Sequence, residues 1–144
     1  MPLTDQHRFG MQLAQMSRGW RAELDRRLAG LGLSQARWLV LLHLARFQDA
    51  PTQRELAQSV GVEGPTLARL LDSLEGQGLV QRQAVVEDRR AKRILLCDTA
   101  RPLIEQIETI ATALRHELFV GVDEADLSVC MRVHGHILAN LEKS

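Results

Sequence analysis

Apolar residues recur every three or four positions at both ends of the chain, and this spacing predicts long amphipathic helices there. The first helix is expected over residues 5–29, and Gly30 and Gly32 end it. Its apolar stripe consists of Phe9, Leu13, Met16, Trp20, Leu24, Leu28 and Leu31. A stripe of this length at the start of a small protein needs a surface to pack against.

Two more amphipathic helices are expected after Asp98-Thr99, and Pro102 falls in the first turn of the first one. Gly121 separates them, and Asp123 is the predicted N-cap of the second. The first stripe consists of Leu103, Ile104, Ile107, Ile110, Ala111, Leu114 and Leu118, and the second of Leu127, Cys130, Met131, His134, Ile137, Leu138 and Leu141. A chain of this size has little core left to cover such faces, so they predict pairing with a second copy.

Three shorter helices are expected in the middle of the chain. Ser34 is the predicted N-cap of a helix over residues 35–47, which is apolar on most sides and therefore belongs in the centre of the core. Residues 52–55 (Thr-Gln-Arg-Glu) form a capping box for a short helix that ends at Gly61. Gly64-Pro65-Thr66 then opens a longer helix. A short helix, a Gly turn and a longer helix have the spacing of a helix-turn-helix.

A β-hairpin is predicted after Gly76 and Gly78. Residues 79–85 and 94–97 are the expected strands, and residues 87–93 are the charged connection between them. Such a hairpin after a helix-turn-helix is a wing, so the predicted fold is mainly α with a small β-hairpin wing: a winged helix-turn-helix.

We expect one domain over residues 1–144. Residues 33–100 would form the DNA-binding lobe, and residues 5–30 and 101–142 the N- and C-terminal dimerisation helices.

Composition narrows the setting. The 144 residues carry 18 basic and 18 acidic side chains, so net charge alone argues against a nucleic-acid binder. However, residues 89–93 hold four cations, and DNA binding needs a positive field at the docking face alone. No apolar run or leader pattern indicates a membrane or secreted protein, and Cys97 and Cys130 match no metal spacing. We therefore expect a cytoplasmic protein.

The start of the helix at Gly64 is the first candidate DNA contact. Gly64 and Pro65 leave room for a close backbone approach, and Thr66 can bond to a base edge or a phosphate. Arg69, one turn on, is long enough to reach guanine O6 and N7. Thr66, Arg69 and Ser73 are expected on the outward face of the helix. The alternative is an ordinary solvated helix face.

The tip of the hairpin is the second candidate. Asp88-Arg89-Arg90 can place an arginine in a minor groove, with Asp88 holding Arg90 in one rotamer. Lys92 and Arg93 are expected to meet phosphates. The alternative is a solvated charged tip.

The chain resembles the MarR family of winged-helix transcription regulators, and within it the SlyA-type subgroup. The segment VEGPTLARLLDSLEGQGLVQRQAVVEDRRAKRILL is the most specific match, with the family's D-x-R wing motif at Asp88 and Arg90; RGWRAELDRRL and SQARWLVLL also match. The resemblance implies a homodimer that binds pseudo-palindromic promoter DNA.

The resemblance also implies an effector, a small aromatic carboxylate that weakens DNA binding. Positions matching the family's ligand region include Arg18, Arg21 and Trp38, which suit charge pairing with a carboxylate and stacking on a ring. Leu42 stands where a histidine is often found. The family's peroxide sensors carry a cysteine in the N-terminal part, and this chain has none there.

Other functions remain open. A winged-helix adaptor could use its basic tip to bind an acidic protein partner, and a metal-responsive regulator could use His116, Cys130 or His134. An enzyme is not expected, because no convergent acid, base and nucleophile are visible. No cofactor or metal site is predicted. The histidines are expected to be structural, and Cys97 and Cys130 are expected to be small buried hydrophobic residues.

Overall fold

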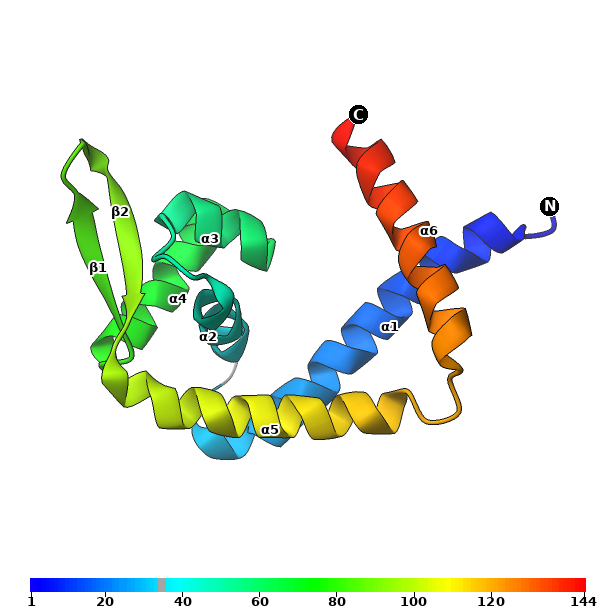
Figure 1. The fold of residues 1–144 in the computed structure, drawn as a ribbon, viewed down its shortest axis with the longest axis horizontal. Coiled ribbons are helices and arrows are strands. Elements are labelled where there is room, and N and C mark those ends of the chain that lie inside the picture. The colour runs from blue at the N-terminus through cyan, green and yellow to red at the C-terminus, as the bar shows by residue number, and fades with distance from the viewer. Residues whose placement is uncertain (34–35) are drawn as a thin grey trace. The chain divides into compact units, whose positions relative to one another are not determined.

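The computed structural model describes residues 1–33 and 36–144, and of residues 88–90 the backbone alone. Packing divides the chain into two units, Met1–Thr112 and Ala113–Ser144. The helices are α1 (Asp5–Leu28), α2 (Arg37–Arg46), α3 (Gln53–Val60), α4 (Gly64–Gly76), α5 (Arg101–Leu118) and α6 (Glu124–Glu142), with short 3-10 turns at η1 (Ala29–Leu31) and η2 (Asp98–Ala100). The strands β1 (Val80–Val85) and β2 (Asp88–Leu96) form a two-stranded antiparallel sheet (Figure 1). The predicted winged helix-turn-helix architecture is confirmed.

Helix α2 lies at the centre of the first unit, against α3, α4 and β2. Trp38, Val40, Leu41, Leu42 and Leu44 are buried, which confirms the predicted central position. The predicted N-cap Ser34 lies outside the described residues, and α2 begins at Arg37. The other elements contribute Leu56, Leu67, Leu71, Leu74 and Ile94, each with 0% exposure. Full burial of one leucine is worth about 1.5–3 kcal/mol, so this packing outweighs any single helix cap.

The helix-turn-helix is built as the sequence predicts. Thr52 caps α3 through a capping box in which its hydroxyl accepts from the Glu55 N–H and the Glu55 carboxylate accepts from the Thr52 N–H. These bonds to Thr52 lower the pKa of Glu55. Gly61 ends α3 at φ 82°, a left-handed conformation that favours glycine, and its N–H donates to the Ala57 carbonyl at 2.9 Å.

The wing differs from its prediction. The expected connection over residues 87–93 is wrong, because the turn occupies residues 86–87 and β2 already begins at Asp88. The strands pair from Val80↔Leu96 to Ala84↔Lys92, and a register shift follows Ala84. The sequence pattern missed the first part of β2 because a run of charged residues shows no alternation of apolar and polar positions. The backbone of such a run can still pair with a neighbouring strand.

The first half of α1 carries exposed apolar residues. Thr4 caps this helix in a capping box with His7, and Leu24 and Leu28 in its second half are buried. Phe9, Leu13 and Met16 from the predicted stripe, and Met11 beside it, are exposed. The stripe is therefore packed along part of its length.

The second unit contains the end of α5 and all of α6. Asp123 caps α6 by accepting from the Ala125 N–H at 3.1 Å, as predicted. Residues 128–142 are exposed, including Val129, Met131, Val133, Ile137, Leu138 and Leu141. Cys130 is exposed and Cys97 half-buried, so the prediction that both are buried is wrong for the single chain. Among the described residues, no helix is both long and apolar enough to cross a membrane.

We expect Thr52→Ala to lower the free energy of unfolding by about 1 kcal/mol, because it removes the hydroxyl that caps α3. Urea denaturation measures this loss. Thr109→Ala is the matched control, because the Thr109 hydroxyl donates to Glu105 O within α5 and caps no helix start. Equal effects of the two substitutions would contradict the capping role.

Candidate nucleic-acid interface

The start of α4 is presented to solvent. Gly64, Pro65 and Arg69 are exposed and Thr66 is half-buried, while the opposite face of the helix carries Leu67 into the core. A Cβ added at Gly64 would meet no heavy atom of the described residues within 4 Å. The chain's own packing therefore leaves room at Gly64, as a closely approaching nucleic-acid backbone requires.

Ser73 has a different environment from the one expected. It is half-buried, and its hydroxyl accepts from Arg37 Nη1 at 3.0 Å. The same guanidinium donates to the Gly32 carbonyl at 3.4 Å. The expectation that Ser73 is free to reach outward is therefore wrong, because its hydroxyl ties α4 to α2. Sequence spacing could not reveal a contact between residues 36 positions apart.

Arg82 attaches the wing to α4. Its Nη2 donates to the Asp72 carboxylate and, at 3.5 Å, to the Ala68 carbonyl. Its backbone N–H donates to Glu75 Oε2 at 3.2 Å, and its Nε lies 3.9 Å from Glu75 Oε1. The side chain is 15% exposed. One arginine of β1 thus holds two carboxylates and a carbonyl of the helix that precedes the wing, a role that sequence analysis missed.

The other strand of the wing is attached to the segment before α3. Ile94 N–H donates to Pro51 O at 2.9 Å, and Arg93 Nη1 donates to Ala50 O at 2.6 Å. Thr52 and Arg93 also form an antiparallel bridge. Arg93 was expected to meet phosphates, but its guanidinium instead helps to hold the base of the wing.

The tip of the wing is described in part. The backbone of Asp88, Arg89 and Arg90 belongs to β2, directly after the turn, and Lys92 is exposed. The side chains of residues 88–90 lie outside the described part of the structure, so the predicted contact between Asp88 and Arg90 stays a prediction.

The three candidate effector residues differ in exposure. Arg18 and Arg21 are exposed and lie three positions apart on α1, whereas Trp38 is 2% exposed. The Trp38 indole N–H donates to the Asp25 carboxylate, so this ring holds α2 against α1. The structure therefore does not bring the three side chains together on one exposed surface.

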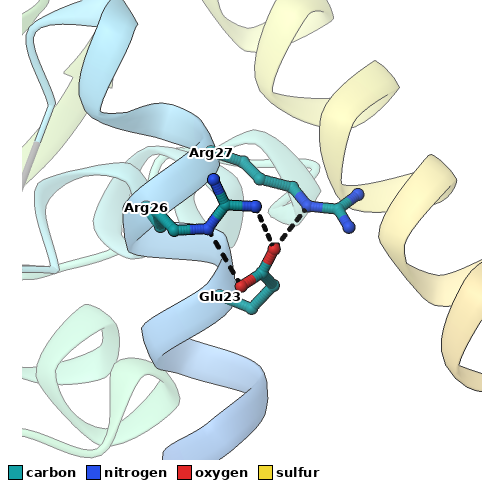
Figure 2. A network of polar contacts seen from close by, with 3 residues as sticks. All are labelled: Glu23, Arg26 and Arg27. Atoms are coloured by element: carbon teal, nitrogen blue, oxygen red, sulfur yellow. Dashed lines mark hydrogen bonds and ion pairs between the residues drawn. The ribbon is translucent and has the colours of Figure 1, made fainter.

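Two further polar groups lie near these residues. Glu23 accepts from Arg26 Nη2 at 2.5 Å and from Arg27 Nε at 2.9 Å, which lowers its pKa to about 2 (Figure 2). His43 on α2 lies 2.7 Å from the Ser59 hydroxyl, which joins α2 to α3. Burial, followed by the charges of Arg46 and Arg21, lowers the pKa of His43, so Arg21 acts electrostatically on α2.

Comparison with known proteins identifies the family. The MarR family model matches residues 31–91. The crystal structure of the transcriptional regulator PA3341 is 67% identical, with a TM-score of 0.89 and coverage of 94% of this chain and 99% of that one. The chain belongs to the MarR family. It is a DNA-binding transcription regulator with a winged-helix fold.

More distant MarR-type structures share the fold. The complex of S. aureus MepR with DNA is 24% identical, with a TM-score of 0.79 and coverage of 96% of this chain and 99% of that one. CouR from Rhodococcus jostii RHA1, bound to p-coumaroyl-CoA, is 23% identical, with a TM-score of 0.79 and 90% coverage of each chain.

We expect Arg82→Gln to lower the free energy of unfolding by about 1.5–3 kcal/mol, the range for hydrogen bonds to charged groups. The substitution removes the guanidinium contacts to Asp72, Glu75 and Ala68, while the backbone N–H at position 82 can still donate to Glu75. Urea denaturation measures the loss.

Arg101→Gln is the matched control for Arg82→Gln. Arg101 pairs with Asp98 at 3.3 Å in an exposed i,i+3 contact, and such pairs contribute about 0–1 kcal/mol. A loss for Arg82→Gln no larger than that for Arg101→Gln would show that the wing does not depend on this attachment.

Proposed function

We propose that the protein acts as a homodimer on pseudo-palindromic promoter DNA, with the start of α4 in a major groove and Arg90 in the adjacent minor groove. The observation that carries this proposal is the attachment of the wing to α4 by Arg82, which joins two exposed elements. The fold match to MepR, which was crystallised in complex with DNA, supports DNA as the partner.

Each predicted contact has a distinct role in this proposal. Arg69 is exposed and reads guanine, and Thr66 bonds to a base edge or phosphate beside it. Gly64 and Pro65 allow the backbone to come close to the DNA. Lys92 would meet phosphates, and Arg89 would contact the DNA from the same tip as Arg90. Ser73 would act through Arg37, by fixing the position of α4.

Dimerisation through the terminal helices accounts for their exposed apolar residues. Burial of apolar surface contributes about 25 cal/mol per Å², so faces of this kind favour a partner. A second copy offers the same faces with two-fold symmetry. Two α4 helices about 34 Å apart would then enter successive major grooves. The exposed residues on which this rests are Phe9, Met11, Leu13 and Met16 on α1, and Met131, Ile137, Leu138 and Leu141 on α6.

We also propose that the protein is a SlyA-type regulator whose effector is a small aromatic carboxylate. Arg18 and Arg21 are exposed on α1 and can pair with its carboxylate. Trp38 is buried, so its indole would stack on the aromatic ring of the effector only after its hydrogen bond to Asp25 breaks. CouR binds p-coumaroyl-CoA, which shares an aromatic acyl group with this ligand class, although its carboxyl group is bonded to sulfur as a thioester. The effector lowers DNA affinity by its preference for one arrangement of the dimer.

We expect Arg90→Ala to weaken binding to the selected DNA site at least about tenfold, or about 1.4 kcal/mol, because it removes the minor-groove contact. Arg69→Ala should relax the preference at one base position. A random duplex pool selects the site, and fluorescence anisotropy gives the affinities.

Sedimentation of both variants supplies the control, because each should remain a folded dimer. Unchanged affinity of the folded Arg90→Ala dimer would reject the role of the wing, and an unaltered base preference of Arg69→Ala would reject direct readout.

For the effector, we expect salicylate at millimolar concentration to release the wild-type dimer from its selected site. Arg21→Gln should need a higher concentration, because the carboxylate loses a partner. Arg8→Gln is the control on the same helix, since Arg8 is exposed and 3.8 Å from Asp5. If salicylate does not release the wild-type dimer, this ligand class is rejected. If the two variants respond equally, the role of Arg21 in the effector site is rejected.

A further inference from the structure

A groove of about 920 Å³ lies between α3, the start of α4 and the wing. Gln53, Arg54 and Gln58 line it from α3, Glu63 from the turn before α4, and Arg82 and Lys92 from the two strands. The attachment of β2 to Pro51 and Ala50 brings the wing to the beginning of α3 (Figure 1). The start of α4 and the wing, which both carry proposed DNA contacts, thus border the same groove.

The charge of this groove favours an anion. Its charged lining residues, among those described, are Arg54, Arg82, Lys92 and Glu63. Arg82 is held by Asp72, whereas Arg54 and Lys92 are exposed on separate walls. Both exposed cations therefore contribute positive charge to the lining of the groove.

The proposed docking specifies what crosses the groove. In duplex DNA a sugar–phosphate strand separates a major groove from the adjacent minor groove. If the start of α4 enters the first and the wing tip enters the second, that strand must pass between α4 and the wing. Duplex DNA carries one negative charge for about every 1.7 Å of its axis, so this strand brings a row of phosphates to Arg54 and Lys92.

We propose that this groove seats the sugar–phosphate strand between the two DNA grooves. Arg54 and Lys92 bind its phosphates from the two walls, and the amides of Gln53 and Gln58 donate to phosphate oxygens. The inference rests on the proposed function and extends it to Gln53, Arg54 and Gln58.

Glu63 has the opposite effect in this groove. Within the described part of the chain, its carboxylate makes no capping hydrogen bond to α4. Facing phosphates, it repels the strand and lowers affinity for every sequence. The balance of Arg54, Lys92 and Glu63 therefore sets the strength of binding, whereas the bases read by Arg69 set the choice of site.

The test uses the full chain and two substitutions of opposite sign, measured on the selected site and on a random duplex over a salt series. Arg54→Gln should weaken binding to both duplexes. It should also reduce the slope of log affinity against log salt by about 0.9 for each lost phosphate contact. Glu63→Gln should strengthen binding to both. The preferred bases should stay the same in both variants.

Arg101→Gln and Arg54→Lys are the controls. Arg101 is an exposed cation outside the residues that line the groove, so its loss should leave affinity and slope unchanged. Arg54→Lys keeps the charge and should keep the slope. Urea denaturation should give equal stability for all variants, because Arg54 and Glu63 are exposed.

Three outcomes separate the hypotheses. An unchanged slope for Arg54→Gln together with unchanged affinity for Glu63→Gln overturns the groove assignment, even if Arg90→Ala weakens binding and the proposed function stands. A changed base preference in Arg54→Gln also overturns it, because the residue would then read bases. Absence of salt-dependent binding by the wild type rejects the proposed function itself.

Discussion

The attachment of the wing to α4 through Arg82 is the constraint on which the DNA-binding lobe depends. A two-stranded hairpin alone is marginally stable in water, so contacts outside the sheet must set its direction. Arg82 makes these contacts from β1 to Asp72 and Glu75, and Arg93 makes them from β2 to Ala50. These contacts therefore set the direction of the wing relative to α4, as the proposed entry into two adjacent grooves requires.

The placement of charged residues explains how a protein with zero net charge can bind a polyanion. Glu23 pairs with Arg26 and Arg27 on α1, so its carboxylate offsets one of these two positive charges. Screening limits electrostatic action to about 8 Å at physiological salt, so distant charges contribute little at the DNA face. The exposed cations at the DNA face therefore determine the electrostatic field there, and the net charge of the whole protein does not.

Sequence predicted the parts of the fold that depend on neighbouring residues. The caps at Thr52 and Asp123 and the end of α3 at Gly61 are local, because each involves groups within four positions. The length of β2 and the engagement of Ser73 depend on distant partners, and no spacing along the chain encodes these. For the same reason, the sequence predicted phosphate contacts for both Lys92 and Arg93, although the guanidinium of Arg93 donates to the Ala50 carbonyl.

The first turn of α2 links the proposed effector region to α4. Trp38 donates to Asp25 on α1, and the preceding Arg37 donates to Ser73 on α4. An effector changes DNA affinity by its differential binding to two arrangements of the protein, and tight binding to both arrangements changes nothing. An aromatic acid bound at Arg21 must therefore alter the contact between α1 and α2 in order to change the position of α4. Because Trp38 is buried, its displacement is the change by which a ligand's ring would distinguish the two arrangements.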